Sequence, residues 1–179
     1  NGVPVTAIAE GAFANATAPH NIVIPGSIKT IGANAFSGAK LYTVEMESGV
    51  ETIGDNAFEG CRSLVRVDIG EGMTSIGNFA FRYCSKLNSI AIGEGLTSIG
   101  NQAFSNCQYL ESVTLPESLT SIGDSAFLCC YLLRTLRIPA GVQTLGQHVF
   151  ASCNNLVVTV TENSHESRSE ERRVGKECR

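Results

Sequence analysis

Cysteine is the residue type in this chain with the widest chemistry, because a thiolate can ligate a metal, attack an electrophile or form a disulfide. The chain has seven cysteines in 179 residues. Five recur at intervals of 23 residues: Cys61, Cys84, Cys107, Cys130 and Cys153. In a regular repeat their side chains would point inward as a parallel column. A zinc site needs four converging ligands, and a disulfide needs facing Cβ atoms about 3.8 Å apart. We therefore expect buried free thiols, no metal and no cofactor.

The remaining candidates for catalysis are few. The three histidines are His20, His148 and His165, and Cys129 is the cysteine expected to face outward beside Cys130. A Cys–His nucleophile needs the two side chains within hydrogen-bond reach, and His148 with Cys129 is the one pair to consider. Nothing in the sequence brings these two together. The sequence therefore predicts a protein that is not an enzyme.

The cysteine interval belongs to a longer pattern that is centred on phenylalanine. Seven of the eight phenylalanines are spaced by 23 residues, with one interval of 22: Phe13, Phe36, Phe58, Phe81, Phe104, Phe127 and Phe150. Around each of them the unit is IGxxAFxxCxxLxxVxIPxxLTS. The interval of 22 indicates a one-residue deletion near Lys40 and Leu41. A fixed period of 20–29 residues is typical of leucine-rich-repeat solenoids.

Each part of this unit predicts a local structure. The LxxVxI part alternates apolar and polar residues, as a half-buried strand does, and Pro or Gly then turns the chain. A second short extended piece, such as residues 96–99, brings the chain back. The GDNAFEGC-type part, with Asp55 or Asn78 as N-cap, predicts one helical turn. The fold expected is a right-handed solenoid of about seven repeats, with a parallel sheet on its concave face and short extended and helical turns opposite.

The unit IGxxAFxxCxxLxxVxIP resembles the BspA-like, or treponemal-type, leucine-rich repeats of bacterial surface proteins. The resemblance runs from about Ile8 to Leu156. It implies a curved, non-enzymatic solenoid that is displayed outside the cell and used for adhesion. The first repeat departs from the pattern, with Ala9 in place of Gly and Pro19 in place of Leu. In the last repeat, residues 157–160 have the wrong phase for the strand.

The two ends of the chain differ from the repeats. We expect a solenoid over residues 1–160 that is truncated at both ends, with signal peptide and anchor outside this fragment. Residues 161–167 fit neither part. Residues 168–179 resemble one translated frame of a sequencing adapter, and we interpret them as not native.

Charge and hydropathy restrict the class of partner. The chain carries 13 basic and 17 acidic residues, of which residues 168–179 hold five and three. Residues 1–167 are left with 8 basic and 14 acidic residues, a net charge of −6. An acidic body argues against binding to a nucleic-acid backbone, which needs clustered Lys and Arg. No apolar run reaches the roughly 18–20 residues that span a membrane, so we expect no membrane insertion. We also expect a monomer.

The candidate binding surface is the outward face of the predicted sheet. By phase, the exposed strand residues are Thr43, Glu45, Arg66, Asp68, Ser89, Ala91, Ser112, Thr114, Thr135 and Arg137. Their polarity suits a protein or glycan partner, but it equally suits a solvated sheet, and Tyr42 is the one aromatic residue beside them. Two hypotheses follow. The chain is an extracellular protein- or glycan-binding adhesion module of a larger cell-surface protein, or a structural spacer that carries another domain away from the cell surface.

Overall fold

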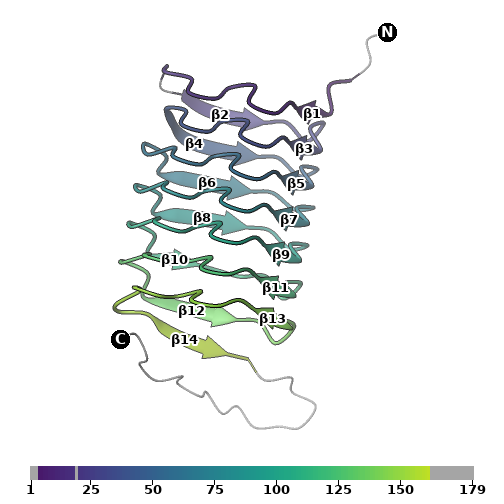
Figure 1. The fold of residues 1–179 in the computed structure, drawn as a ribbon. Helices are drawn as coiled ribbons and strands as arrows, with labels where there is room; N and C mark the ends of the chain where they lie inside the picture. The colour runs from purple at the N-terminus through teal and green to yellow at the C-terminus, as the bar shows by residue number, and fades with distance from the viewer. Residues whose placement is uncertain (1–3, 19, 162–179) are drawn as a thin grey trace.

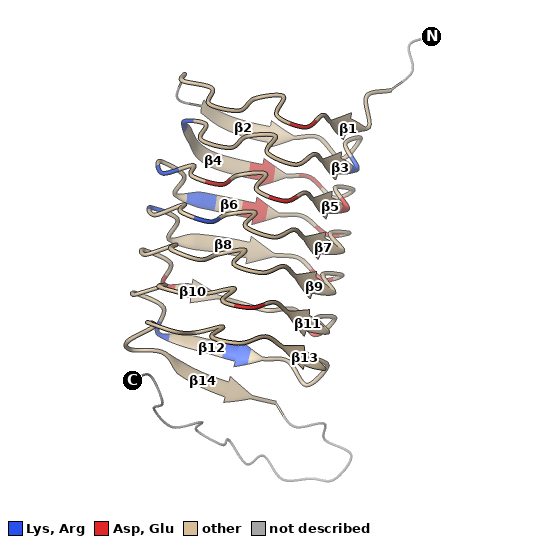
Figure 2. Cartoon of the chain, in the orientation of Figure 1, with Lys and Arg blue, Asp and Glu red and all other residues tan. Residues whose placement is uncertain are grey.

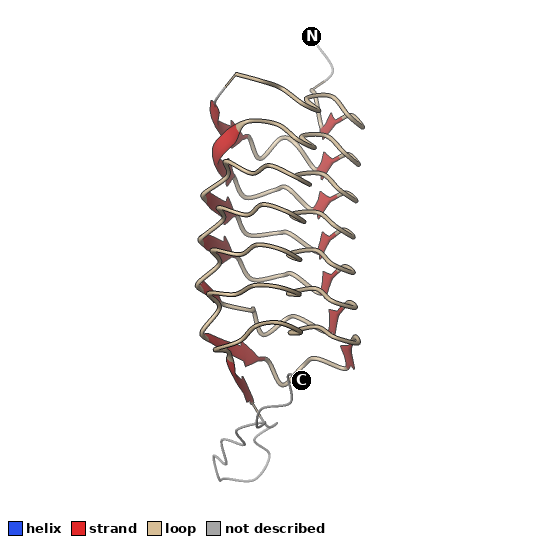
Figure 3. Cartoon of the chain, turned by 60° about the vertical axis from the view of Figure 1, so that its left-hand side comes forward, coloured by secondary structure: helices blue, strands red, loops and turns tan. Residues whose placement is uncertain are grey.

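The computed structural model describes residues 4–18 and 20–161 as a stack of similar coils (Figure 1). Of the unassigned residues 161–167, only Thr161 belongs to the described part, and the adapter-like residues 168–179 lie outside it. Each coil contributes one strand to each of two seven-stranded parallel sheets. The described residues contain no helix, and Figure 3 shows the two columns of strands with turns between them. The predicted repeat solenoid with a parallel sheet is thus confirmed.

The first sheet, here called the long-strand sheet, has the order β14-β12-β10-β8-β6-β4-β2. Its strands are β2 (His20–Ile24), β4 (Leu41–Met46), β6 (Arg66–Ile69), β8 (Ser89–Ile92), β10 (Ser112–Val113), β12 (Thr135–Ile138) and β14 (Val157–Val160). Along most of these strands the residues alternate between the core and the outside, as in β6, where Val67 and Ile69 are buried.

The second sheet, here called the short-strand sheet, consists of two-residue strands in the order β1-β3-β5-β7-β9-β11-β13. They are β1 (Ala7–Ile8), β3 (Thr30–Ile31), β5 (Thr52–Ile53), β7 (Ser75–Ile76), β9 (Ser98–Ile99), β11 (Ser121–Ile122) and β13 (Thr144–Leu145). These are the short extended pieces that the sequence predicts after each long strand. Because they pair with their equivalents in neighbouring repeats, they form a sheet of their own.

The predicted helical turn around each phenylalanine is wrong. In the third complete repeat, Asn56 and Gly60 flank Phe58 and have φ of 56° and 69°, and residues in the left-handed region break an α-helix. This backbone points alternate N–H groups along the solenoid. Those of Asn56, Phe58 and Gly60 donate to carbonyls of the next repeat at 2.7–2.9 Å. Inter-repeat hydrogen bonds therefore replace those within a helix.

The predicted N-cap residues also have another role. The side-chain oxygen of Asp55 accepts a hydrogen bond from the backbone N–H of Asn78 at 2.7 Å. Asn78 in turn accepts from Asn101, and Asn101 from Asp124, at 2.8 and 2.7 Å. Each Asp or Asn thus satisfies a backbone donor of the following repeat. The side chains bridge successive repeats instead of beginning a helix.

The glycine of the IG pair is required by the closeness of this packing. A Cβ atom on Gly100 would lie 2.6 Å from the backbone nitrogen of Asn78 in the preceding repeat, and one on Gly123 would meet Asn101 at the same distance. Real Cβ contacts are not that short, so a side chain there would push the repeats apart. The backbone spacing itself selects glycine at this position.

The phenylalanines form an internal spine. Consecutive rings are stacked with centroids 5.1–5.9 Å apart and interplanar angles of 0–18°. Phe58, Phe81, Phe104 and Phe127 are fully buried, whereas Phe13 at the first repeat is 50% exposed. The core is therefore one continuous column that runs through all repeats.

Two irregular repeats change the register of the long-strand sheet, one between β2 and β4 and the other between β12 and β14. The one-residue deletion near Lys40 and Leu41 appears as a register shift between β2 and β4, after the pair His20 and Leu41. At the other end, the expected change of strand phase is confirmed, although a strand still forms there. β14 pairs with β12 one residue out of the usual register, so that Val158 lies opposite the buried Leu136 and packs against the core.

Truncation of a central ring should destabilise the protein much more than truncation of a terminal one. We expect Phe104→Ala to lower the free energy of unfolding by about 3–5 kcal/mol, because a large cavity opens between two stacked neighbours. Phe13→Ala is the matched control and should cost clearly less, because its ring is half exposed. Urea denaturation followed by circular dichroism measures both, and equal losses would contradict a continuous spine.

Candidate functional site

The outer face of the long-strand sheet gathers the residues that the sequence predicts for binding. The register places Thr43, Arg66, Ser89, Ser112 and Thr135 in one row of adjacent strands. A second row contains Glu45, Asp68 and Ala91, with Thr114 directly after β10 and Arg137 on β12. Thr43 and Asp68 are half-buried and the other eight are exposed. All the predicted residues therefore lie on one face.

Charged groups lie toward both ends of this face, in the direction of the solenoid axis. Arg66 Nε donates to both carboxylate oxygens of Asp68 at 3.0 and 2.9 Å. This hydrogen bond and the charges of Asp68 and Glu45 raise the pKa of Arg66, so its positive charge is permanent. On β12, Arg137 pairs with Glu117 and donates to Thr161 Oγ1 at 3.0 Å. Asp68 and Glu117 hold the two guanidinium groups, so both positive charges have a defined position on the face.

The middle of the face is flat and polar. Between Arg66 and Arg137, the outward positions of β8 and β10 carry Ser89, Ala91 and Ser112. Small side chains keep this strip low, so a ligand could approach the sheet closely. The arrangement can make hydrogen bonds and two charge contacts, but it contains no nucleophile with an activating base.

The cysteines form the predicted inward ladder, with a hydrogen bond that the sequence did not indicate. The thiol of each ladder cysteine donates to the carbonyl of the phenylalanine in the preceding repeat, at 3.1–3.3 Å: Cys61 to Phe36, Cys84 to Phe58, Cys107 to Phe81, Cys130 to Phe104, and Cys153 to Phe127. All five are buried and free. Burial raises the pKa of Cys84 and of Cys107, so both stay protonated at neutral pH.

Within residues 4–18 and 20–161, no group of His, Cys, Asp or Glu is arranged to hold a metal ion.

Cys129 is half-buried, and it lies beside Tyr131, whose pKa it raises through a hydrogen bond. No hydrogen bond or ion pair joins Cys129 to His148 in the same part of the chain. His165 lies outside it. The structure therefore does not bring together the pair considered for nucleophilic catalysis.

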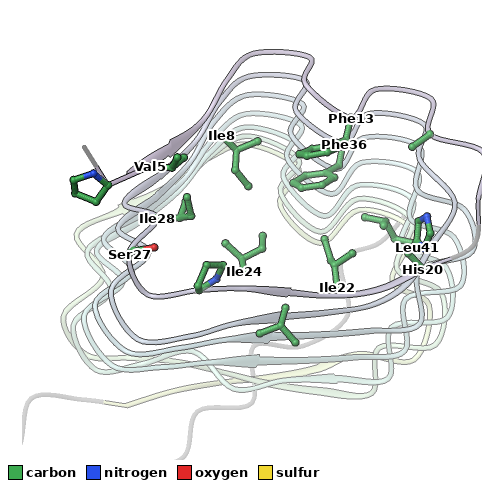
Figure 4. A pocket seen from close by; sticks show the side chains of 14 residues that line it. Val5, Ile8, Phe13, His20, Ile22, Ile24, Ser27, Ile28, Phe36 and Leu41 are labelled. Atoms are coloured by element: carbon green, nitrogen blue, oxygen red, sulfur yellow. The ribbon is translucent and has the colours of Figure 1, made fainter. Parts of the chain in front are cut away.

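An apolar hollow of about 740 Å³ opens at the N-terminal end of the stack. Figure 4 looks along the solenoid and shows Ile8, Phe13, Ile22 and Ile28 around the inside of the first coil. This hollow is the end of the core column that no further repeat covers in the structure. It has the chemistry of the core and lacks convergent polar groups.

A second surface was not singled out from the sequence. All four tyrosines lie in the segment that connects a phenylalanine to the next long strand or begins that strand, and all are exposed by 40–57%. The segment also carries Arg82, which pairs with Glu59, the acid Glu111, and four cations that form no ion pair. We call the set the tyrosine edge: Lys40, Tyr42, Arg62, Tyr83, Lys86, Tyr109, Tyr131 and Arg134. Each tyrosine lies at a different distance along the chain from its phenylalanine, so the four do not share one position of the repeat. For this reason the repeat pattern alone did not indicate the cluster.

Comparison with known proteins agrees with the repeat geometry. The model of the BspA type leucine rich repeat region matches residues 6–107 and 74–171. The chain belongs to this family. No curated protein matches the sequence. No helix of the described residues is long and apolar enough to cross a membrane.

Solved structures of bacterial proteins share the fold. A leucine-rich repeat protein of T. pallidum is 32% identical with a TM-score of 0.76, and the match covers 86% of this chain and 72% of that one. A leucine-rich cell surface protein of Faecalibacterium prausnitzii is 29% identical with a TM-score of 0.55, over 84% and 52% of the two chains. The pneumococcal vaccine antigen PcpA, at 22% identity and a TM-score of 0.63 over 89% and 57%, shows the fold alone. The chain thus spans roughly half to three quarters of these structures.

The ladder thiols should be almost unreactive in the folded protein. We expect alkylation by iodoacetamide to label Cys129 well before Cys61, Cys84 or Cys107, because the latter three are buried, and burial also raises the pKa of Cys84 and Cys107. Mass spectrometry of peptides from native and urea-treated protein measures the difference. Rapid native labelling of the ladder cysteines, or disulfides between them, would contradict the inward ladder.

Stability should fall as the solution becomes alkaline. The folded pKa of Cys84 and Cys107 is raised, whereas an unfolded thiol has a pKa of about 8.5. Above that pH the unfolded chain loses protons that the folded chain retains, so the free energy of unfolding decreases. A Cys84→Ala/Cys107→Ala variant should show a weaker decline between about pH 8 and 10. Urea denaturation across this range measures it, and parallel curves would contradict the argument.

Proposed function

We propose that this chain is a non-enzymatic recognition module of an extracellular, bacterial cell-surface protein, which binds a protein or glycan partner through the outer face of the long-strand sheet. The observation that carries the proposal is the row of predicted polar residues, exposed on one rigid face and flanked by the held charges of Arg66 and Arg137. Membership of the repeat family and the cell-surface relative from F. prausnitzii support the location.

Rigidity favours binding at such a face. A solenoid presents a long surface whose backbone is already ordered, so little conformational entropy is lost when a partner docks. The face also lacks large apolar side chains between Arg66 and Arg137, which keeps it soluble when it is unoccupied. Its hydrogen-bonding groups and fixed charges would then provide specificity rather than apolar burial.

The alternative is a spacer that holds another domain away from the cell surface. The continuous stack of phenylalanine rings and the hydrogen bonds between repeats favour it, because they make the body stiff along its axis. A spacer requires no partner on either sheet. The two functions therefore differ in whether the isolated chain binds anything.

The decisive measurement is binding of residues 1–167 to arrays of purified glycans and extracellular proteins. We expect Arg66→Ala/Arg137→Ala to weaken binding to the recognised partner about tenfold or more, which corresponds to about 1.4 kcal/mol or more. Lys29→Ala removes a positive charge beside β3, away from the sheet face and from every other candidate surface, and is the control. It should bind to that partner like the wild type.

Three outcomes would reject the sheet-face proposal. Equal binding by Arg66→Ala/Arg137→Ala and by Lys29→Ala would show that these arginines do not contact the partner. Binding by the full chain but not by residues 1–167 would assign it to the tail. Failure to bind any member of the arrays would favour the spacer.

A further inference from the structure

The four cations of the tyrosine edge form no ion pair, although the described residues contain more acidic than basic side chains. Residues 4–18 and 20–161 contain 8 Lys and Arg against 12 Asp and Glu. Ion pairs in this part of the chain use Lys29, Arg66, Arg82 and Arg137. The four cations left without one all belong to the tyrosine edge: Lys40, Arg62, Lys86 and Arg134. Figure 2 shows basic segments along the side where the long strands begin, with most acidic segments toward the opposite side.

Aromatic surface accompanies these unpaired charges. Tyr42, Tyr83, Tyr109 and Tyr131 come from the second, fourth, fifth and sixth repeats and are exposed by 48%, 41%, 57% and 40%. Exposed tyrosines offer a flat apolar ring with a polar tip, a combination that is enriched at binding surfaces. An acidic, soluble body has no structural need to place all of its tyrosines on one side.

Part of this edge is already fixed in position. The guanidinium group of Arg82 lies 5.0 Å from the ring centre of Phe79 and 4.7 Å from that of Tyr83. The same group forms an ion pair with Glu59 at 3.2 Å. Since this contact holds Arg82, it also supports the ring of Tyr83. Binding there would therefore cost little side-chain entropy.

A polar hollow lies next to this supported ring. It has a volume of about 510 Å³, and its lining includes Lys40, Arg62, Tyr83, Ser37 and Ser63. Two unpaired cations, an aromatic ring and two hydroxyl groups thus surround one open depression, together with Glu59, whose carboxylate is paired with Arg82. From Lys40 to Arg134 the edge crosses four repeat steps, about 19 Å at the spacing of parallel strands. This length suits a linear ligand that lies along the solenoid axis.

We propose that the tyrosine edge binds an acidic polysaccharide, with tyrosine rings against the sugar rings and Lys40, Arg62, Lys86 and Arg134 against its carboxylate or sulfate groups. This site is distinct from the outer face of the long-strand sheet and does not depend on binding there. The chemistry fits because sugars present both C–H faces and hydroxyl groups, and the edge offers aromatic faces beside hydrogen-bonding side chains.

Other linear anions fit the edge less well. A nucleic acid carries a phosphate on each nucleotide and is bound by dense positive charge, whereas this edge has about one unpaired cation per repeat and the body is acidic. An extended peptide commonly binds by adding a strand to a free sheet edge. Backbone groups here are already used between repeats, as in the hydrogen bond from Tyr83 N–H to Ser105 at 3.0 Å.

Tyrosine fluorescence reports on this edge alone, because the chain has four tyrosines, all on the edge, and no tryptophan. The full chain is titrated with polygalacturonate, heparin and uncharged dextran. We expect a saturable fluorescence change with at least one of the two acidic polysaccharides, weakened by salt, and none with dextran. The carboxylated and sulfated probes tell which anionic group is preferred. Binding to the basic tail would leave this signal unchanged, because residues 168–179 contain no tyrosine.

Two triple variants separate the edge from general electrostatics. Lys40→Gln/Arg62→Gln/Lys86→Gln should weaken binding about tenfold or more. Lys29→Gln/Arg66→Gln/Arg137→Gln removes the same charge elsewhere and should change the affinity by less than about twofold. Tyr109→Ser/Tyr131→Ser should weaken binding even at high salt, because stacking is not screened. Thermal unfolding of each variant confirms that it is folded.

The proposal is overturned by any of four results. These are no fluorescence change with either acidic polysaccharide, equal loss in the two triple variants, tighter binding of polyglutamate, or tighter binding of a single-stranded oligonucleotide. The last two would identify an acidic peptide or a nucleic acid as the partner. Loss in the Lys29/Arg66/Arg137 variant alone would instead assign the polysaccharide to the sheet face.

Discussion

Contact between successive repeats is the interaction on which the rest of this structure depends. A single coil has two short strands, one phenylalanine and a few apolar side chains, and it cannot bury them by itself. Stacking satisfies the backbone in both sheets and in the left-handed turns around each ring, as at Phe58. The same closeness excludes a side chain at Gly100 and stacks the rings 5.1–5.9 Å apart. Stability and surface geometry therefore have one origin.

Chemistry in the interior is suppressed by this packing. The ladder cysteines lie one repeat apart. Each thiol donates a hydrogen bond to a phenylalanine carbonyl, and none of them forms a disulfide. Burial keeps Cys84 and Cys107 protonated. The hydrogen bond gives Cys a role that Ala cannot have, since Ala39 occupies the same repeat position but has no thiol to donate to Phe13. Residues that would be reactive elsewhere serve here as core.

Because the interior is buried and unreactive, the residues available for binding are those on the outside of the coils. There the repeat does not dictate the residue type, and each surface carries its own composition. The outer sheet face has small polar residues between two held arginines, and the tyrosine edge has aromatic rings among unpaired cations. The two differ in chemistry and could act on different partners, and they adjoin at the start of the long strands, where Tyr42 lies on β4.

The sequence alone determined the repeat, the parallel sheet, the buried rings and the inward cysteines, because residues one period apart must occupy equivalent positions. It also determined which strand residues face outward, since side chains alternate along a strand. Tertiary structure decided what depends on neighbouring repeats. The turns at Asn56 and Gly60 are not helical, because their N–H groups have better partners in the next coil. β14 regains its phase by slipping one residue against β12. Tyrosines at different offsets, such as Tyr83 and Tyr109, come to share one edge only when the coils are stacked, because their nearness lies across repeats rather than along the chain.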